Sequence, residues 1–431
     1  MQDEGLVRVI GPRALGLSVI NMVIGAGIFA LPGLVAAELG SAAILAYLVC
    51  SVTVALVFLC FAEVGSRVSS SGGAYAYVEE AFGPFIGFIA SILLWFGFSA
   101  LADAAITVVM VDSMSLVVPT LGEPIPRALF IIGLLAFLAA VNVRGVKAGV
   151  RLFIFNTLVK LVPLLLLVGA GIFAIDVDHL AIPEWPSAAS IGAATILLFY
   201  AFNGAESALN ASGEIRSPAR TVPLGLLLGL GGVLALYVGL QTVSQGVLGP
   251  ELANNTENPL VAVATGVFGD WGGKMLIAAA VLSIYANLSG DLLGGPRIVF
   301  ASSRDGNLPS VLSKVHPRYK TPHVAIIFFA IVIGVFALSG TFRYLAVVAT
   351  GSLLLVDLGV ILAVLRLRRR DGMPKEGEFT LPFGPVIPVL SFAFVGWLLL
   401  QMPLDEAATI AALVGACVVF YAVRTVFWRP S

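Results

Sequence analysis

Twelve long apolar runs, separated by short polar stretches, occupy most of the chain and leave few folds open to it. An α-helix needs about 20 apolar residues to cross the roughly 30 Å hydrocarbon core of a bilayer. The runs are continuous rather than alternating, which excludes a membrane β-barrel. We therefore expect an all-α integral membrane protein of 12 transmembrane helices, over residues 14–35, 42–64, 85–118, 128–143, 150–175, 191–212, 222–247, 274–302, 324–339, 344–365, 386–402 and 407–427.

Composition separates this chain from soluble proteins. Hydrophobic residues make up 59% of it and charged residues 11%, whereas a soluble globular chain is about 45–50% apolar and about 25% charged. The formal net charge of −1 offers no basic field for phosphates, so we expect the lipid bilayer as a partner and no nucleic acid. The three cysteines lie inside apolar runs without metal or redox spacing, and neither a metal site nor a cofactor is expected.

Lysine and arginine are distributed unevenly between the two sides of the membrane. Of the 24 such residues, twenty fall on the side that carries the N-terminus, three fall on the opposite side and Lys160 lies within a span. Cytoplasmic loops carry the excess of positive charge in membrane proteins. We therefore expect a multi-pass protein of the inner (cytoplasmic) membrane with both termini in the cytoplasm.

Two clusters that contain glycine interrupt the spans. The first span holds Ile24, Gly25, Ala26 and Gly27, and the sixth holds Tyr200, Phe202, Asn203, Gly204 and Glu206. Backbone groups freed inside a bilayer must face protein or a wet cavity, so each cluster is a candidate helix break. Close helix packing is the alternative for Gly25 and Gly27, and it is what we expect of the glycines in the seventh span, Gly225, Gly229, Gly231 and Gly232.

The two clusters fall in corresponding spans if the chain consists of two five-span repeats and two further helices. An odd number of spans per repeat makes the second copy run upside down, and interrupted helices at matching positions of such repeats indicate a transporter binding site. The expected divisions are 1–180 for spans one to five, 181–370 for spans six to ten, and 371–431 for spans eleven and twelve with the C-terminal tail.

Four ordered motifs resemble those of the amino acid–polyamine–organocation (APC) superfamily of transporters. They are Gly25–Phe29 with Pro32; Ser71–Tyr75 followed by Glu80–Gly83; Phe202–Glu206 followed by Glu214, Pro218 and Pro223; and Arg297 followed by Arg304–Gly306 and Pro309. The resemblance covers nearly the whole chain. It implies a leucine-transporter-like fold of two inverted five-helix repeats, in which broken helices one and six hold an amino acid near the middle of the membrane.

Elementary electrostatics agrees with that implied site. N–H groups exposed over Gly25, Ala26 and Gly27 at the start of a half-helix favour a carboxylate. Carbonyls freed around Ile24 and at Tyr200, Phe202 and Asn203, beside Gly204, would accept hydrogen bonds from an α-ammonium group. Such a site reads the part common to all amino acids and does not choose among them.

Lys160 lies about ten residues into the fifth span. A lysine in mid-membrane costs about 2.5–3.5 kcal/mol on insertion scales, which calls for a specific role. The resemblance implies that it stands where sodium-coupled members of the wider fold bind sodium. We expect its ammonium to bond carbonyls near Ile24 or Gly25 and a hydroxyl of Ser283 or Ser289, either as a proton carrier or as a permanently charged brace of spans one, five and eight.

Other polar residues within spans carry open alternatives. Glu206 either bridges the broken sixth span by hydrogen bonding or takes part in proton coupling. Asp103 and Asp291 depart from the family pattern; Asp103 either faces the cavity and favours a cationic substrate or pairs with a buried donor. Tyr285 and Tyr200 are candidates for an aromatic gate, with packing as the alternative.

The sequence thus predicts a secondary active transporter that moves amino acids by alternating access, with proton-coupled import as the leading mode. A sodium-independent obligatory antiporter of amino acids or amines is the alternative. No metalloprotease or nucleophile-elbow motif is present, and we expect no enzymatic activity. Because spans one and six lack an acidic cluster, neutral amino acids are favoured over polyamines.

Overall fold

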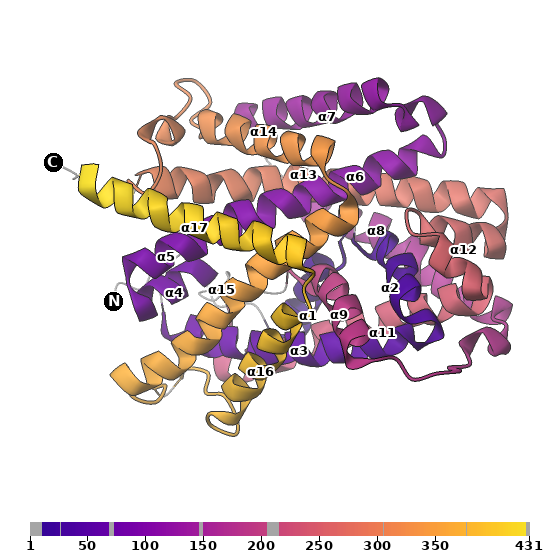
Figure 1. The fold of residues 1–431 in the computed structure, drawn as a ribbon, viewed down its shortest axis with the longest axis horizontal. Coiled ribbons are helices and arrows are strands. Elements are labelled where there is room, and N and C mark those ends of the chain that lie inside the picture. Colours follow the sequence, from indigo (N-terminus) through magenta and orange to yellow (C-terminus); the bar gives the residue numbers. More distant parts are fainter. Residues whose placement is uncertain are drawn as a thin grey trace.

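The computed structural model describes residues 11–25, 27–68, 73–145, 150–204, 215–304, 306–375 and 377–427, and helices make up most of them (Figure 1). Eight helical segments are long and apolar enough to cross a membrane: Leu31–Arg67, Pro84–Ser115, Pro124–Arg144, Thr157–Ala174, Arg220–Asn254, Asp270–Arg304, Phe342–Asp371 and Leu404–Thr425. Four shorter apolar helices accompany them: Ala188–Phe202, Pro259–Phe268, His323–Ser339 and Val386–Leu400.

The run predicted over 14–35 is two half-helices. Helix α1 (Pro12–Val23) ends where Ile24 turns to an extended conformation with φ −71° and ψ 91°. A single 3₁₀ turn over Gly27–Phe29 then leads into α2 (Leu31–Leu39), which is followed by α3 (Ala43–Arg67). The interruption leaves backbone groups without helical partners in the interior of the protein.

The helices that follow up to residue 171 contain one departure from α-helical geometry. They are α4 (Ala74–Phe82), α5 (Pro84–Ile92), α6 (Leu101–Ser115), α7 (Pro124–Arg144) and α8 (Val150–Gly171). A π-helical segment, Leu93–Ala100, joins α5 to α6, so the predicted third span is one continuous helical element. The short helix α4 was not expected from the sequence.

The remaining helices begin with α9 (Ala188–Phe202), which ends at Asn203. Residues 205–214, which include the second part of the predicted sixth span, lie outside the described residues. The later helices are α11 (Pro218–Leu248), α12 (Pro259–Phe268), α13 (Asp270–Arg304), α14 (His323–Ser339), α15 (Phe342–Asp371), α16 (Val386–Leu400) and α17 (Leu404–Phe427). Helix α12 was not expected, and α13 exceeds its predicted range at both ends.

Small residues hold α1 tightly against α11. A Cβ atom on Gly225 would lie 2.6 Å from the side chain of Leu15, and one on Gly229 would lie 2.5 Å from that of Val19. Real carbon atoms do not approach this closely, so these glycines serve close packing, as expected. Around Gly231, by contrast, a Cβ would meet nothing within 4 Å.

A buried ion pair ties α3 to α15 at one end of the bundle. The carboxylate of Glu63, whose side chain is 0% exposed, accepts hydrogen bonds from Arg368 Nε at 2.7 Å and Nη2 at 2.5 Å. The same carboxylate accepts from the backbone N–H of Leu381 at 2.8 Å, ahead of α16. Glu63 was not predicted to be a buried acid, because it falls near the end of its predicted span.

Candidate substrate site at the helix breaks

The ends of α1 and α9 meet inside the bundle. Gly204 has a φ of +115°, and a Cβ atom there would lie 2.7 Å from the carbonyl oxygen of Met22. Both observations require glycine at this position. On the other side of the crossing, a Cβ on Gly27 would lie 3.0 Å from the ring of Tyr200. The two predicted clusters therefore lie side by side and form a single site in the protein.

Tyr237 of α11 joins the two helix ends. Its buried hydroxyl lies 3.0 Å from the carbonyl oxygen of Ala201 and 3.3 Å from that of Val23, and it donates to them. The ring of Phe202 packs edge-to-face against Tyr237, with 5.1 Å between ring centroids. The side chain of Phe202 is therefore part of the packing, and only its backbone is available to a ligand. Tyr237 could not be predicted as a site residue, because a tyrosine within an apolar span cannot be distinguished by sequence from one that packs in the core.

Polar backbone groups are left open at the crossing. The N–H of Ile24 bonds the carbonyl of Ile20 at 3.0 Å and closes α1. Beyond it, the N–H groups of Gly25 and Gly27 have no hydrogen-bond partner among the residues that the structure describes. The side-chain nitrogen Nδ2 of Asn203 is also buried without a hydrogen-bond partner among the described residues. Ala26 and Glu206, both predicted for this site, lie outside the described residues.

Lys160 reaches this site from α8. Its side chain is 2% exposed, and Nζ donates to the carbonyl oxygen of Asn21 in the last turn of α1. The hydroxyl of Thr157, one turn earlier in α8, donates to Oδ1 of the same asparagine at 2.8 Å. Both oxygen atoms of Asn21, the backbone carbonyl and Oδ1, thus accept hydrogen bonds from one helix.

The partner of Lys160 differs from the prediction. We expected carbonyls near Ile24 or Gly25 and a serine hydroxyl, but the ammonium bonds Asn21, one turn earlier. The hydroxyl of Ser283 is buried without a hydrogen-bond partner among the described residues, so no bond from Lys160 to it forms. The hydroxyl of Ser289, within α13, also has no hydrogen bond in the described part of the chain. The reason is that helix α1 ends at Val23, and its last turn offers the nearest carbonyl that lacks an N–H partner.

One face of α13 approaches the break. A Cβ on Gly25 would lie 3.1 Å from the side-chain nitrogen of Asn287. Residues four apart share a helix face, so Ser283 and Asp291 lie on the face of Asn287. Tyr285 lies two residues, or about 200°, from Asn287 around the helix. Its side chain is 37% exposed, and this orientation does not support a selective role for it at the break.

Two acids that the sequence analysis treated separately come together beside this face. The carboxyl groups of Asp103 in α6 and Asp291 in α13 lie close enough to interact directly. Asp103 is 2% exposed, and its Oδ2 atom has no donor among the described residues. The Tyr200 hydroxyl donates to the carbonyl of Ala102, next to Asp103, at 2.9 Å. The acids therefore adjoin the crossing through both Asn287 and Tyr200.

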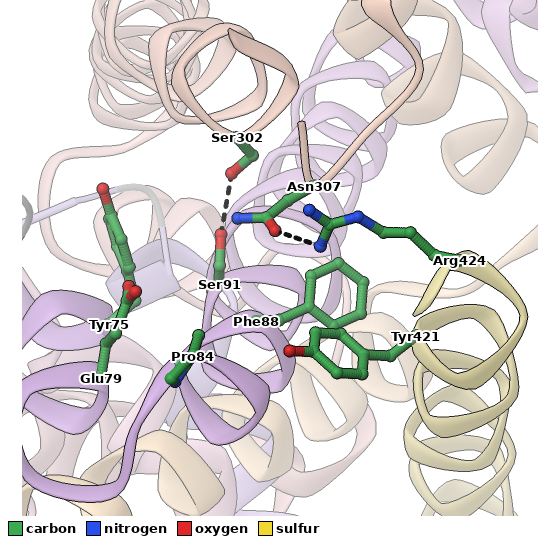
Figure 2. Close-up of a pocket in the computed structure, with 10 residues that line it drawn as sticks. Tyr75, Glu79, Pro84, Phe88, Ser91, Ser302, Asn307, Tyr421 and Arg424 are labelled. Carbon is green, nitrogen blue, oxygen red and sulfur yellow. Dashed lines mark hydrogen bonds between the residues drawn. The ribbon is translucent and has the colours of Figure 1, made fainter. Parts of the chain in front are cut away.

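A cavity of about 340 Å³ lies away from the helix crossing (Figure 2). Helices α4 and α5, the end of α13 and α17 contribute its walls, and none of the predicted site residues is among them. Within it, the Ser91 and Ser302 hydroxyls are 3.1 Å apart, and Arg424 donates to the side-chain oxygen of Asn307 at 2.5 Å. This cavity is distinct from the helix crossing.

Two features define the class of this protein. Its apolar helices are long enough to cross a membrane, and the break in one helix meets the end of a second helix inside the bundle. Both features are typical of membrane transport proteins. Residues 11–430 match the amino acid permease family. The chain belongs to this family within the APC superfamily, which confirms the resemblance read from its motifs, and it is a transporter rather than an enzyme.

Individual relatives align along nearly their whole length. The chain is 29% identical over 401 residues to the serine/threonine exchanger SteT of Bacillus subtilis, covering 91% of this chain and 90% of that one. It is 28% identical over 421 residues to the branched-chain amino acid permease BcaP of the same organism, covering 93% and 89%. A methylthioribose transporter of B. subtilis is 28% identical over 425 residues, covering 93% and 90%.

Proposed function

We propose that this chain is a secondary active transporter that moves amino acids across the cytoplasmic membrane by alternating access, with proton-coupled import as its mode. The observation that carries the proposal is the meeting of the two helix ends at Gly204 and Met22, next to the N–H groups of Gly25 and Gly27, which have no hydrogen-bond partner among the described residues. The proposed frame has 12 spans, two inverted repeats over 1–180 and 181–370, two further helices over 371–431, and both termini in the cytoplasm.

The charges at the crossing match an α-amino acid. The 3₁₀ turn that leads into α2 begins at Gly27, and the N-terminal end of a helix carries a partial positive charge that favours a carboxylate. Helices α1 and α9 both end there, and their C-terminal carbonyls carry partial negative charge, which favours an ammonium. An amino acid would therefore bind with its carboxylate towards Gly27 and its ammonium towards Ile24 and Asn203.

Lys160 supports either of two coupling modes. An ammonium that loses its proton would bond the Asn21 carbonyl more weakly, because the hydrogen bond would no longer be charge-assisted, and the last turn of α1 could then move more easily, which is what proton coupling needs. An ammonium that stays charged would brace α1 against α8 throughout the cycle. The second mode fits the alternative function, a sodium-independent obligatory antiporter, and SteT, a relative at 29% identity, is named an exchanger.

Uptake of a labelled amino-acid panel into proteoliposomes tests both. Wild type is compared under an inward proton gradient, under a sodium gradient and with preloaded amino acid, beside Lys160→Met and a control, Lys274→Met, at an exposed position of α13. Proton-stimulated uptake that is lost only in Lys160→Met supports proton-coupled import. Uptake only into preloaded vesicles supports the antiporter, and sodium dependence or the absence of any uptake overturns both.

A further inference from the structure

We infer that Asp103 and Asp291 form the part of the substrate site that selects the side chain, and that this part accepts the positive group of a cationic amino acid. The inference rests on the proposed function and deepens it, because the helix breaks alone read only the groups common to all amino acids. It also replaces the expectation of neutral substrates, because that expectation was based only on the lack of an acidic cluster in spans one and six.

The position of the pair matches a side-chain subsite. Asn287 touches the break beside Gly25, and Asp291 lies one turn further along the same face of α13. Four helical residues span about 6 Å along the axis, a reach that the side chain of lysine or ornithine covers from its α-carbon. From the opposite side, Tyr200 contacts Gly27 with its ring and Ala102 with its hydroxyl, and so links the break to the neighbourhood of Asp103.

The pair also lacks a partner of the right charge. Oδ2 of Asp103 is buried without a donor, and a carboxylate can only accept hydrogen bonds. Its neighbour Asp291 has an exposed side chain, so protein atoms do not enclose the pair on that side. Contact between two carboxyl groups therefore requires a cation or a shared proton between them.

The net charge of the groups around the pair also favours a cationic ligand. Among the described residues, the titratable groups that interact with the pair are Lys160, through Asp291, and the neutral phenol of Tyr200. Two carboxylates and one ammonium leave one negative charge unbalanced, and uncompensated charge within a membrane protein is costly. One substrate ammonium or guanidinium balances the cluster. A proton shared by the two carboxyl groups does the same when no substrate is bound, and it is released to solvent when the substrate arrives.

Competition by matched isosteres tests the inference. In proteoliposomes, apparent affinities are measured for lysine against norleucine and for arginine against citrulline, which differ in charge at similar length. The proteins are wild type, Asp103→Asn, Asp291→Asn and Asp112→Asn; Asp112 lies on the same helix as Asp103 but pairs with Arg127 at 2.6 Å. We expect wild type to prefer each cationic member by about tenfold or more, both site variants to lose that preference, and Asp112→Asn to keep it.

The outcomes separate this inference from the proposed function. Equal affinity of wild type for lysine and norleucine, with neutral amino acids transported, overturns the inference and leaves the function standing. The inference is also overturned if Asp291→Asn abolishes the pH dependence of the uptake of neutral amino acids and changes nothing else, because the pair would then hold only a proton. Wild-type protein that transports no amino acid of either kind overturns the proposed function itself.

Discussion

The ammonium of Lys160 bonds the carbonyl of Asn21, the acceptor that the N–H of Gly25 would use if the first span were a continuous helix. A charged side chain from α8 thus takes the place of a backbone hydrogen bond at the point where α1 ends. The bond satisfies the carbonyl, which would otherwise be buried without a donor. The Gly25 N–H is left open beside Asn287. The break and the charge in the fifth span are two aspects of one arrangement.

Lys160→Met keeps the length of the side chain and removes its ammonium. We expect transport to fall by at least tenfold, because the Asn21 carbonyl loses its donor and Asp291 loses its nearby positive charge. An unsatisfied buried acceptor costs about 1–3 kcal/mol, so the variant should remain folded, as size-exclusion chromatography in detergent would report. Wild-type transport rates in this variant would contradict the role given to Lys160.

Tyr237→Phe removes only the hydroxyl that joins the two helix ends. The loss of one hydrogen bond corresponds to about 0.5–1.5 kcal/mol, and we expect initial uptake rates to fall by about three- to tenfold. Tyr344→Phe is the matched control, since that hydroxyl pairs with Thr409 at an exposed position. A similar decrease in both variants would show that the effect is not specific to the crossing.

Gly204→Ala tests whether the crossing must be as tight as the structure has it. A methyl group there would meet the Met22 carbonyl at 2.7 Å, at a φ of +115°, so we expect loss of transport and a lower unfolding temperature. Gly231→Ala is the control in open space within α11; alanine is favoured over glycine in a helix by about 1 kcal/mol, and its stability should stay the same or rise. Equal behaviour of the two variants would contradict the account.

Glu63→Ala should be among the most destabilising substitutions of a charged residue. It leaves the guanidinium of Arg368 without its carboxylate in a buried position, and breaking such a pair costs about 3–5 kcal/mol. Glu80→Ala removes an exposed partner of Arg370, where the cost is about 0–1 kcal/mol. Thermal unfolding in detergent compares them, and equal shifts in the midpoint would refute the assignment of Glu63 as a structural centre.

The positions of the helices could be predicted well from the sequence, because a bilayer determines the length of each apolar run. Glycine clusters inside such runs have few structural roles. The break after α1 at Ile24, the end of α9 at Asn203 and the unusual charge of Lys160 were predicted from the sequence, whereas the second half of the sixth span lies outside the described residues. The motifs of the resemblance identified the family.

Contacts between residues of different helices could not be predicted from the sequence. Asp103 and Asp291 are almost 190 residues apart, and nothing in one sequence shows that their helices lie side by side. The same holds for Tyr237 at the crossing and for Arg368 on Glu63. The acceptor of Lys160 was misplaced by one turn, because the end of α1 at Val23 could not be fixed to a residue from an apolar run.

Protection of an introduced thiol tests the central claim, that an amino acid binds where the helix ends meet. The native cysteines Cys50, Cys60 and Cys417 are buried, so background alkylation is low. The account predicts that a transported amino acid slows alkylation of Asn287→Cys by about tenfold. It should leave Tyr285→Cys, on another face of the same helix, unchanged. Equal alkylation of Asn287→Cys with and without that amino acid would contradict binding at the break.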